Sequence, residues 1–115
     1  MGDVADDEVS IDEHGRAVIA LPAQVDITTA ERVREGLLSL VDSGCQQLHL
    51  DMSAVEKIDS TGLAVVMAFM ATLHRERPEA KVLFDGLSPM VNRILHMFRA
   101  QDFNIETEFR ERGDD

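Results

Sequence analysis

The chain has 115 residues, of which 44% are hydrophobic, so it can bury the core of one domain but not of two. It carries 22 Asp and Glu residues against 11 Lys and Arg, and the formal net charge of -11 disfavours direct contact with nucleic acid or anionic membranes. No apolar run is long enough to cross a membrane, and the first residues lack the basic-then-apolar order of a signal peptide. We therefore expect a cytoplasmic protein without membrane insertion.

The N-terminal part predicts an acidic tail followed by a β-hairpin. Residues 1–8 are rich in Asp and Glu, which predicts a solvated, flexible tail. Val9 and Ile11 then alternate with polar residues, Gly15 stands at a turn, and residues 17–21 form a short apolar run. Two short strands joined by a turn are the simplest interpretation.

The first helix is predicted to start near Thr28. Thr28 and Glu31 have the three-residue spacing of a capping box, in which two side chains satisfy free N–H groups at a helix start. Gly44 can adopt the left-handed conformation that commonly ends a helix. The buried face is predicted from apolar residues at three- and four-residue steps: Ala30, Val33, Leu37, Leu40 and Val41.

The rest of the chain alternates between strands and helices. Strands are predicted at residues 48–52, 81–85 and 103–107, with a charged C-terminal tail at residues 108–115. A third helix is predicted to start at Ser88, which is followed by proline at the first helical position. Alternation of this kind predicts an α/β fold with a mostly parallel sheet.

The most distinctive segment is the start of the second predicted helix. Asp59, Ser60 and Thr61 can all cap a helix, and the apolar helical pattern begins at Leu63. Because a helix N-terminus has free N–H groups and a partial positive charge, it stabilises an anion such as a phosphate on a nearby hydroxyl. The segment follows a core strand, where binding sites of α/β sheets usually lie.

Catalytic interpretations of this segment lack their usual parts. Asp59-Ser60-Thr61-Gly62 has one residue more than the Asp-Thr/Ser-Gly signature of aspartic proteases. No Gly-x-Ser-x-Gly elbow or phosphate-binding Gly-x-x-x-x-Gly-Lys loop is present, and the four histidines lack the spacing of a known metal motif. We therefore expect neither an enzyme nor a metal or cofactor site.

Three segments, in the same order, resemble the STAS family, the domain of bacterial anti-sigma factor antagonists. The run from Leu48 to Leu63 resembles its core, a strand ending in Asp-hydrophobic-Ser, then a short corner and Asp-Ser-Ser/Thr-Gly-Leu. The segment from Leu21 to Asp26 is similar to the family's Leu-x-Gly-Glu-Leu-Asp, although Ala23 and Gln24 replace its usual glycine and acid. The segment from Leu87 to Leu95 is similar to its Ser-Pro-x-Val-x-Arg-Leu helix.

This resemblance implies a fold and a switch. The fold is a single layer of mostly parallel sheet with an N-terminal hairpin and with helices packed mainly on one face, here over residues 9–107. In such proteins the serine at the position of Ser60 is phosphorylated by a partner anti-sigma factor, which is an ATP-dependent serine kinase, and is dephosphorylated by a phosphatase. The unmodified form binds the kinase and frees a sigma factor or another target. The phosphorylated form does not bind.

On this basis we expect Ser60 to be the phosphorylated residue and the protein to be a monomer or weak dimer. The methionines next to the apolar face of the third helix, Met90 and Met97, can also serve an exposed partner surface. An alternative remains, in which Ser60 only caps the helix and the domain is a constitutive scaffold or accessory subunit of a transporter or signalling complex. The expected partner-binding residues are Asp26, Asp59, Ser60, Thr61, Gly62 and Met90.

Overall fold

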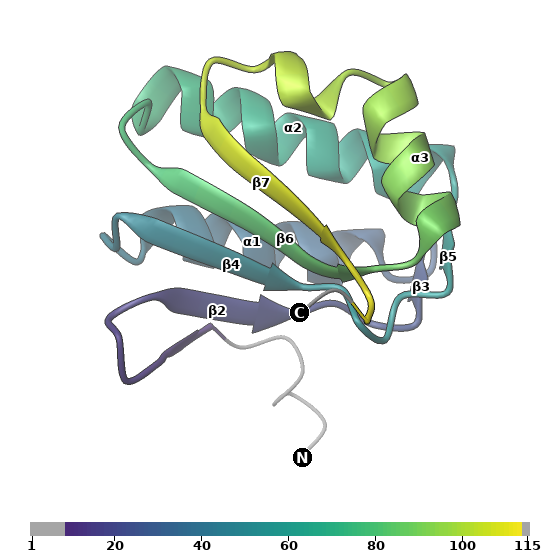
Figure 1. Cartoon of the computed structure of the whole chain (residues 1–115), viewed down its shortest axis with the longest axis horizontal. Coiled ribbons are helices and arrows are strands. Elements are labelled where there is room, and N and C mark those ends of the chain that lie inside the picture. Colours follow the sequence, from purple (N-terminus) through teal and green to yellow (C-terminus); the bar gives the residue numbers. More distant parts are fainter. Residues whose placement is uncertain (1–8, 114–115) are drawn as a thin grey trace.

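A computed structural model describes residues 9–113, which form a five-stranded sheet with three α-helices (Figure 1). The predicted acidic tail, residues 1–8, lies outside the described residues. The first two strands pair antiparallel, as the predicted hairpin, and all other pairs of this sheet are parallel. The strand order is β1 (Ser10–Ile11), β2 (Ala17–Ala20), β4 (Gln47–Asp51), β6 (Lys81–Leu87) and β7 (Glu106–Glu111).

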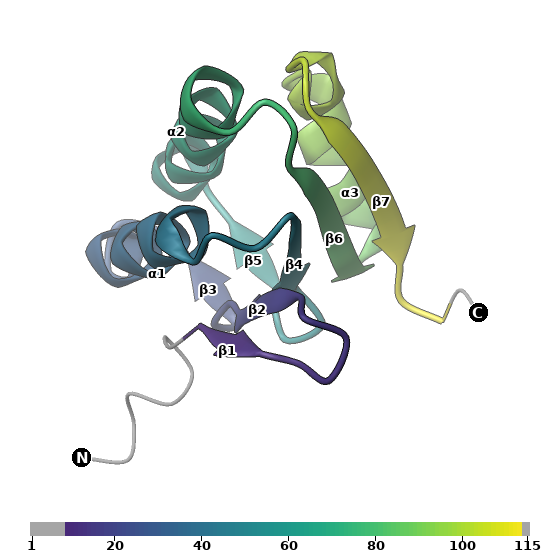
Figure 2. The same cartoon turned by 90° about the vertical axis from the view of Figure 1, so that its left-hand side faces the viewer.

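The helices cover one face of this sheet. They are α1 (Ala30–Asp42), α2 (Ser60–Glu76) and α3 (Pro89–Met97), and a short 3-10 turn follows α3 at Ala100–Asp102. Figure 2 shows α1 and α2 together on one side of the sheet. The third helix contacts the same face, since the ring of His96 lies 4.3 Å from that of Phe109, which stacks on buried Phe84. The predicted α/β architecture is therefore confirmed.

A second, very short pair of strands lies beyond the main sheet. β3 (Gln24–Val25) pairs in parallel with β5 (Lys57–Ile58), and Figure 1 shows both near the N-terminal end of α2. Val25 is completely buried. This pair fixes the chain on both sides of the corner that precedes α2.

The predicted start of α1 was wrong by one residue. Thr29, not Thr28, is the N-cap, and no side-chain hydrogen bond caps the helix. The hydroxyl of Thr28 instead donates to Oδ1 of Asp26 at 2.6 Å, and the hydroxyl of Thr29 donates to the carbonyl of Gln24. Both threonines therefore stabilise the turn after β3. Hydrogen bonding within this turn competes with helix capping for the same short side chains.

The predicted charged tail from Glu108 onward was also wrong. β7 runs to Glu111, because Phe109 stacks on Phe84 with ring centroids 5.2 Å apart while its charged neighbours point to the uncovered face. Gly113 is the last residue described. No helix within residues 9–113 has the length and apolar character needed to span a membrane.

Candidate functional site

The segment before α2 is held by the short strand β3. The N–H of Asp59 donates to the carbonyl of Val25 at 3.2 Å, which continues the pairing of β3 with β5. Asp59 has extended backbone angles, and its Oδ1 accepts a hydrogen bond of 2.9 Å from the N–H of Gly62. Asp59 is therefore the N-cap, out of the three candidates that the sequence offers, and its carboxylate also complements the positive end of the helix.

Gly62 allows this turn to touch β3. It is buried, and a Cβ built on it would lie 1.9 Å from the carbonyl oxygen and 2.6 Å from the carbonyl carbon of Val25. Both are backbone atoms of a strand, so they cannot move aside as the end of a flexible side chain could. Only glycine fits between the first turn of α2 and β3.

Ser60 is exposed, as Asp59 is, but it does not cap the helix. It is the first residue of α2, and within residues 9–113 its hydroxyl makes no hydrogen bond. Thr61 is half-buried, and Gly62 is buried. The structure thus presents the hydroxyl of Ser60 at the surface of a helix start that Asp59 and Gly62 hold in place.

Asp26 lies in the turn directly after β3. Its Oδ1 accepts hydrogen bonds from the hydroxyl of Thr28 at 2.6 Å and from the N–H of Thr28 at 2.9 Å. These bonds, chiefly the one from the hydroxyl, lower the pKa of Asp26 below its ordinary value of 3.8, and the charge of Lys57 acts in the same direction. A carboxylate is therefore fixed beside the pair of strands that carries Asp59.

The lowered pKa predicts how Asp26 affects stability. Because the carboxylate is favoured in the folded state, it stabilises the fold above pH 3.8, and this contribution is lost as the pH falls through the lower folded-state pKa. Asp26→Asn should be less stable than the unchanged protein at pH 7, and the difference should shrink in acid. Urea unfolding of both proteins at several pH values measures this, and a difference that persists unchanged to about pH 2 would contradict it.

Met90 is the last of the predicted site residues. It lies on the first turn of α3 and is 49% exposed. Figure 1 shows the N-terminal turns of α2 and α3 at the same end of the molecule, together with β3 and β5. The structure therefore brings the five other predicted residues together around the short strand pair and places Met90 on the neighbouring helix.

Sequence reasoning missed Ile27 as a candidate. Ile27 follows Asp26 and is 75% exposed, the largest exposed fraction among the large apolar side chains of residues 9–113. An exposed apolar residue beside a fixed carboxylate is typical of the rim of a protein-binding surface. The only signal in the sequence was an isoleucine outside any periodic pattern.

Arg112 was also missed, and it holds the corner between β4 and β5. Its guanidinium donates to the carbonyls of Gly86, Met52 and Val55, so that the end of β7 is tied to the segment leading into β5. The corner is anchored from the other side as well, because the N–H of Glu56 donates to the carbonyl of Ala23 at 2.7 Å. Asp59 and Ser60 follow directly on this braced segment.

Arg112→Ala should therefore loosen the corner. Removing the guanidinium leaves three carbonyls without a charged hydrogen-bond donor, so we expect the free energy of unfolding to fall by about 1–2 kcal/mol. Arg75→Ala on α2 is a matched control, since within residues 9–113 Arg75 makes only a long, exposed ion pair with Glu76. Chemical denaturation measures both variants, and equal stability of Arg112→Ala and Arg75→Ala would contradict the bracing role.

The amino-acid sequence matches the model of a known domain family. The model of the STAS domain matches residues 8–112, nearly the whole chain. The chain belongs to the STAS domain family. The match extends past Thr107 to the end of β7, so this STAS domain includes the strand and the arginine that had been assigned to a tail.

Solved structures agree on the fold. This STAS domain is similar to a putative anti-sigma factor antagonist from Thermotoga maritima, with 16% identity, a TM-score of 0.69, and 90% of this chain and 84% of that chain covered. It is also similar to an anti-sigma factor antagonist from Mycobacterium paratuberculosis, with 23% identity, a TM-score of 0.66, and 90% and 88% covered. No curated protein matches the sequence. The chain thus has the fold of anti-sigma factor antagonists.

Proposed function

We propose that this STAS domain is a cytoplasmic regulatory protein that acts as an anti-sigma factor antagonist and not as an enzyme. In its unmodified form it binds an anti-sigma factor that is a serine kinase. Phosphorylation of Ser60 by that kinase releases it, and a phosphatase restores the binding form. The two solved structures named above are described as antagonists of this class, one of them as putative, which supports this choice of partner.

The observation that carries the proposal is the exposed hydroxyl of Ser60 on a rigid helix start. A kinase must bring the hydroxyl in line with the γ-phosphate of ATP, so the acceptor has to be accessible and held in position. Ser60 is exposed, while Asp59 caps the helix and Gly62 packs on β3. The residues that hold the segment are therefore distinct from the residue that would be modified.

Phosphorylation would change the surface more than the fold. A phosphate adds about -1.5 to -2 charges, and its attraction to the helix N-terminus contributes only about 0.3–1 kcal/mol. The N–H of Gly62 already donates to Asp59, so capping does not depend on Ser60. The main effect would be a second negative group beside Asp59, on the surface that meets the kinase.

The experiment is a phosphorylation assay with the full chain, Mg²⁺, ATP and a serine-kinase anti-sigma factor from the same organism. We expect the intact mass to increase by one phosphate, and Ser60→Ala to gain none. Ser39→Ala, which removes an exposed hydroxyl on α1, should gain one phosphate at the normal rate. Phosphorylation of Ser60→Ala at the normal rate would refute the site. Binding without any phosphate gain would favour the constitutive scaffold.

A further inference from the structure

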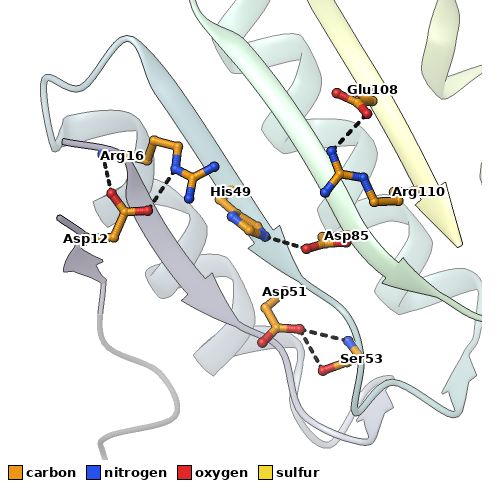
Figure 3. A network of polar contacts seen from close by, with 8 residues as sticks. All are labelled: Asp12, Arg16, His49, Asp51, Ser53, Asp85, Glu108 and Arg110. Carbon is orange, nitrogen blue, oxygen red and sulfur yellow. Dashed lines mark hydrogen bonds and ion pairs between the residues drawn. The ribbon is translucent and has the colours of Figure 1, made fainter. Parts of the chain in front are cut away.

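Among residues 9–113, no helix covers the face of the sheet opposite α1, α2 and α3, and this face carries charged side chains in an ordered pattern. Figure 3 shows Arg16, His49, Asp85 and Arg110 on this face, with Asp85 bonded to His49 at 3.0 Å. The face is formed by alternate residues of β2, β4, β6 and β7, whose other residues form the core. We call it the open face, and it is separate from the surface around Ser60.

The register of the strands arranges these side chains in rows across the sheet. At the start of the parallel strands, Lys81 pairs with Gln47 on one side and with Glu106 on the other. In the middle, Val18, His49, Leu83 and Glu108 form one continuous row. At the strand ends, Asp51 pairs with Asp85, and alternation along β7 puts Arg110 beyond Glu108.

Charge changes sign along individual strands of the open face. β6 begins with Lys81 and presents Asp85 four residues later, whereas β7 begins with Glu106 and presents Arg110 four residues later. A second copy of the sheet can pack face to face on this one so that each strand lies over its own counterpart and runs antiparallel to it. Oppositely charged side chains then meet on β6 and on β7. Lys81 then faces Asp85, and Glu106 faces Arg110.

We propose that the open face binds a second copy of this chain in this way. The arrangement is a closed two-fold dimer, in which every contact occurs twice. The middle row lies along the axis, so Val18, His49, Leu83 and Glu108 each meet their own counterparts. The ion pair of Glu108 with Arg110 at 3.1 Å offsets part of the repulsion between the two Glu108 carboxylates. If the two-fold axis instead ran along the strands, β4 would lie over β6, so Lys81 would face uncharged Gln47 and Asp85 would face Asp51. The charge pattern therefore favours the antiparallel orientation.

The size of the face predicts that this dimer is weak. Four strands about 4.8 Å apart, with five residues each at about 3.3 Å, give a flat footprint of roughly 300 Å² per copy. The total buried surface therefore stays below the roughly 1,200 Å² of stable interfaces. Two shallow hollows of about 260 and 380 Å³ along the face leave room for bridging water.

The experiment must distinguish the effect of these local charge pairs from the effect of the net charge of -11, which opposes self-association at low salt. Sedimentation velocity of the full chain at about 0.15 M salt, where the screening length is about 8 Å, is suitable because contacting pairs survive such screening. We expect a monomer–dimer equilibrium that shifts with protein concentration. Lys81→Glu should weaken the dimer at least tenfold, since it sets like charges opposite each other at two symmetric places.

Two variants make the result specific. Arg75→Glu on α2 changes the net charge by the same amount, so we expect a much smaller effect from it. The double variant Lys81→Glu/Asp85→Lys exchanges the two charges and should bring dimerisation back toward the original level, although it breaks the bond from Asp85 to His49. The exchange Glu106→Arg/Arg110→Glu gives the same readout without changing that bond, and circular dichroism verifies the fold of each variant.

A chain that remains monomeric at concentrations up to about 1 mM would overturn the proposal, because the interface would then contribute less than about 4 kcal/mol to association. Equal effects of Lys81→Glu and Arg75→Glu would also overturn it, since net charge alone would then explain the loss. Failure of both charge exchanges to restore the dimer would do the same. These outcomes are independent of the phosphorylation switch, which is measured at Ser60 with a kinase.

Discussion

Gly62→Ala should lower the free energy of unfolding by about 3 kcal/mol, at the upper end of what overpacking usually costs. The added Cβ would lie 1.9 Å from the carbonyl oxygen of Val25, so β3 and the first turn of α2 would have to separate by more than an ångström. That movement would also lengthen the bond from the N–H of Asp59 to the same carbonyl. In a chain of this size, we expect the melting temperature to fall by about 10 °C or more.

Thermal and chemical denaturation measure this effect, and Ser60→Ala is the control from the same helical turn. Ser60 is exposed, so its substitution should change the stability by less than about 0.5 kcal/mol. If Gly62→Ala were as stable as Ser60→Ala, the close contact between β3 and the first turn of α2 would be contradicted. Because alanine is otherwise the better helix former, the expected sign comes entirely from that contact.

Ser60→Asp should weaken binding to the kinase by about a hundredfold or more. In the proposed complex the hydroxyl of Ser60 approaches the γ-phosphate of bound ATP, so a carboxylate at that place would meet negative charge in a site that excludes water. Like charges facing each other across an interface cost several kcal/mol, and every 1.4 kcal/mol is a factor of ten in affinity. Asp59 adds a further negative charge at the adjacent position.

Ser60→Asn separates charge from size in this prediction. Its side chain has nearly the shape of aspartate but no charge, so it should bind the kinase much more tightly than Ser60→Asp does. Surface plasmon resonance with immobilised kinase and ATP compares the two directly. If both variants bind equally weakly, steric fit and not charge repulsion would explain the loss.

The start of α2 could be predicted from sequence because its signals are local. The carboxylate of the N-cap Asp59 accepts a hydrogen bond from the N–H of the third residue after it, and this spacing can be recognised in the sequence. The same reasoning failed for α1, where the hydroxyl of Thr28 had two possible partners and bonded to Asp26. A short polar side chain can serve a turn or a helix, and the sequence does not choose between them.

The parts that could not be predicted depend on contacts between distant segments. Phe109 belongs to a strand because Phe84 stacks on it, yet in the sequence it stands among charged residues that are typical of a tail. Arg112 braces the corner only because β7 ends beside Met52 and Val55, more than fifty residues earlier in the chain. Strands of two residues, such as β3 and β5, carry too little periodicity to be recognised.

Release of the kinase by phosphorylation of Ser60 can be measured as a difference in affinity between two forms of the protein. Full-length protein with phosphoserine installed at position 60 and the unmodified protein are each titrated calorimetrically into the same serine-kinase anti-sigma factor with ADP bound. We expect clear binding of the unmodified protein and an affinity at least about a hundredfold lower for the phosphorylated protein. Equal affinities of the two forms would contradict it.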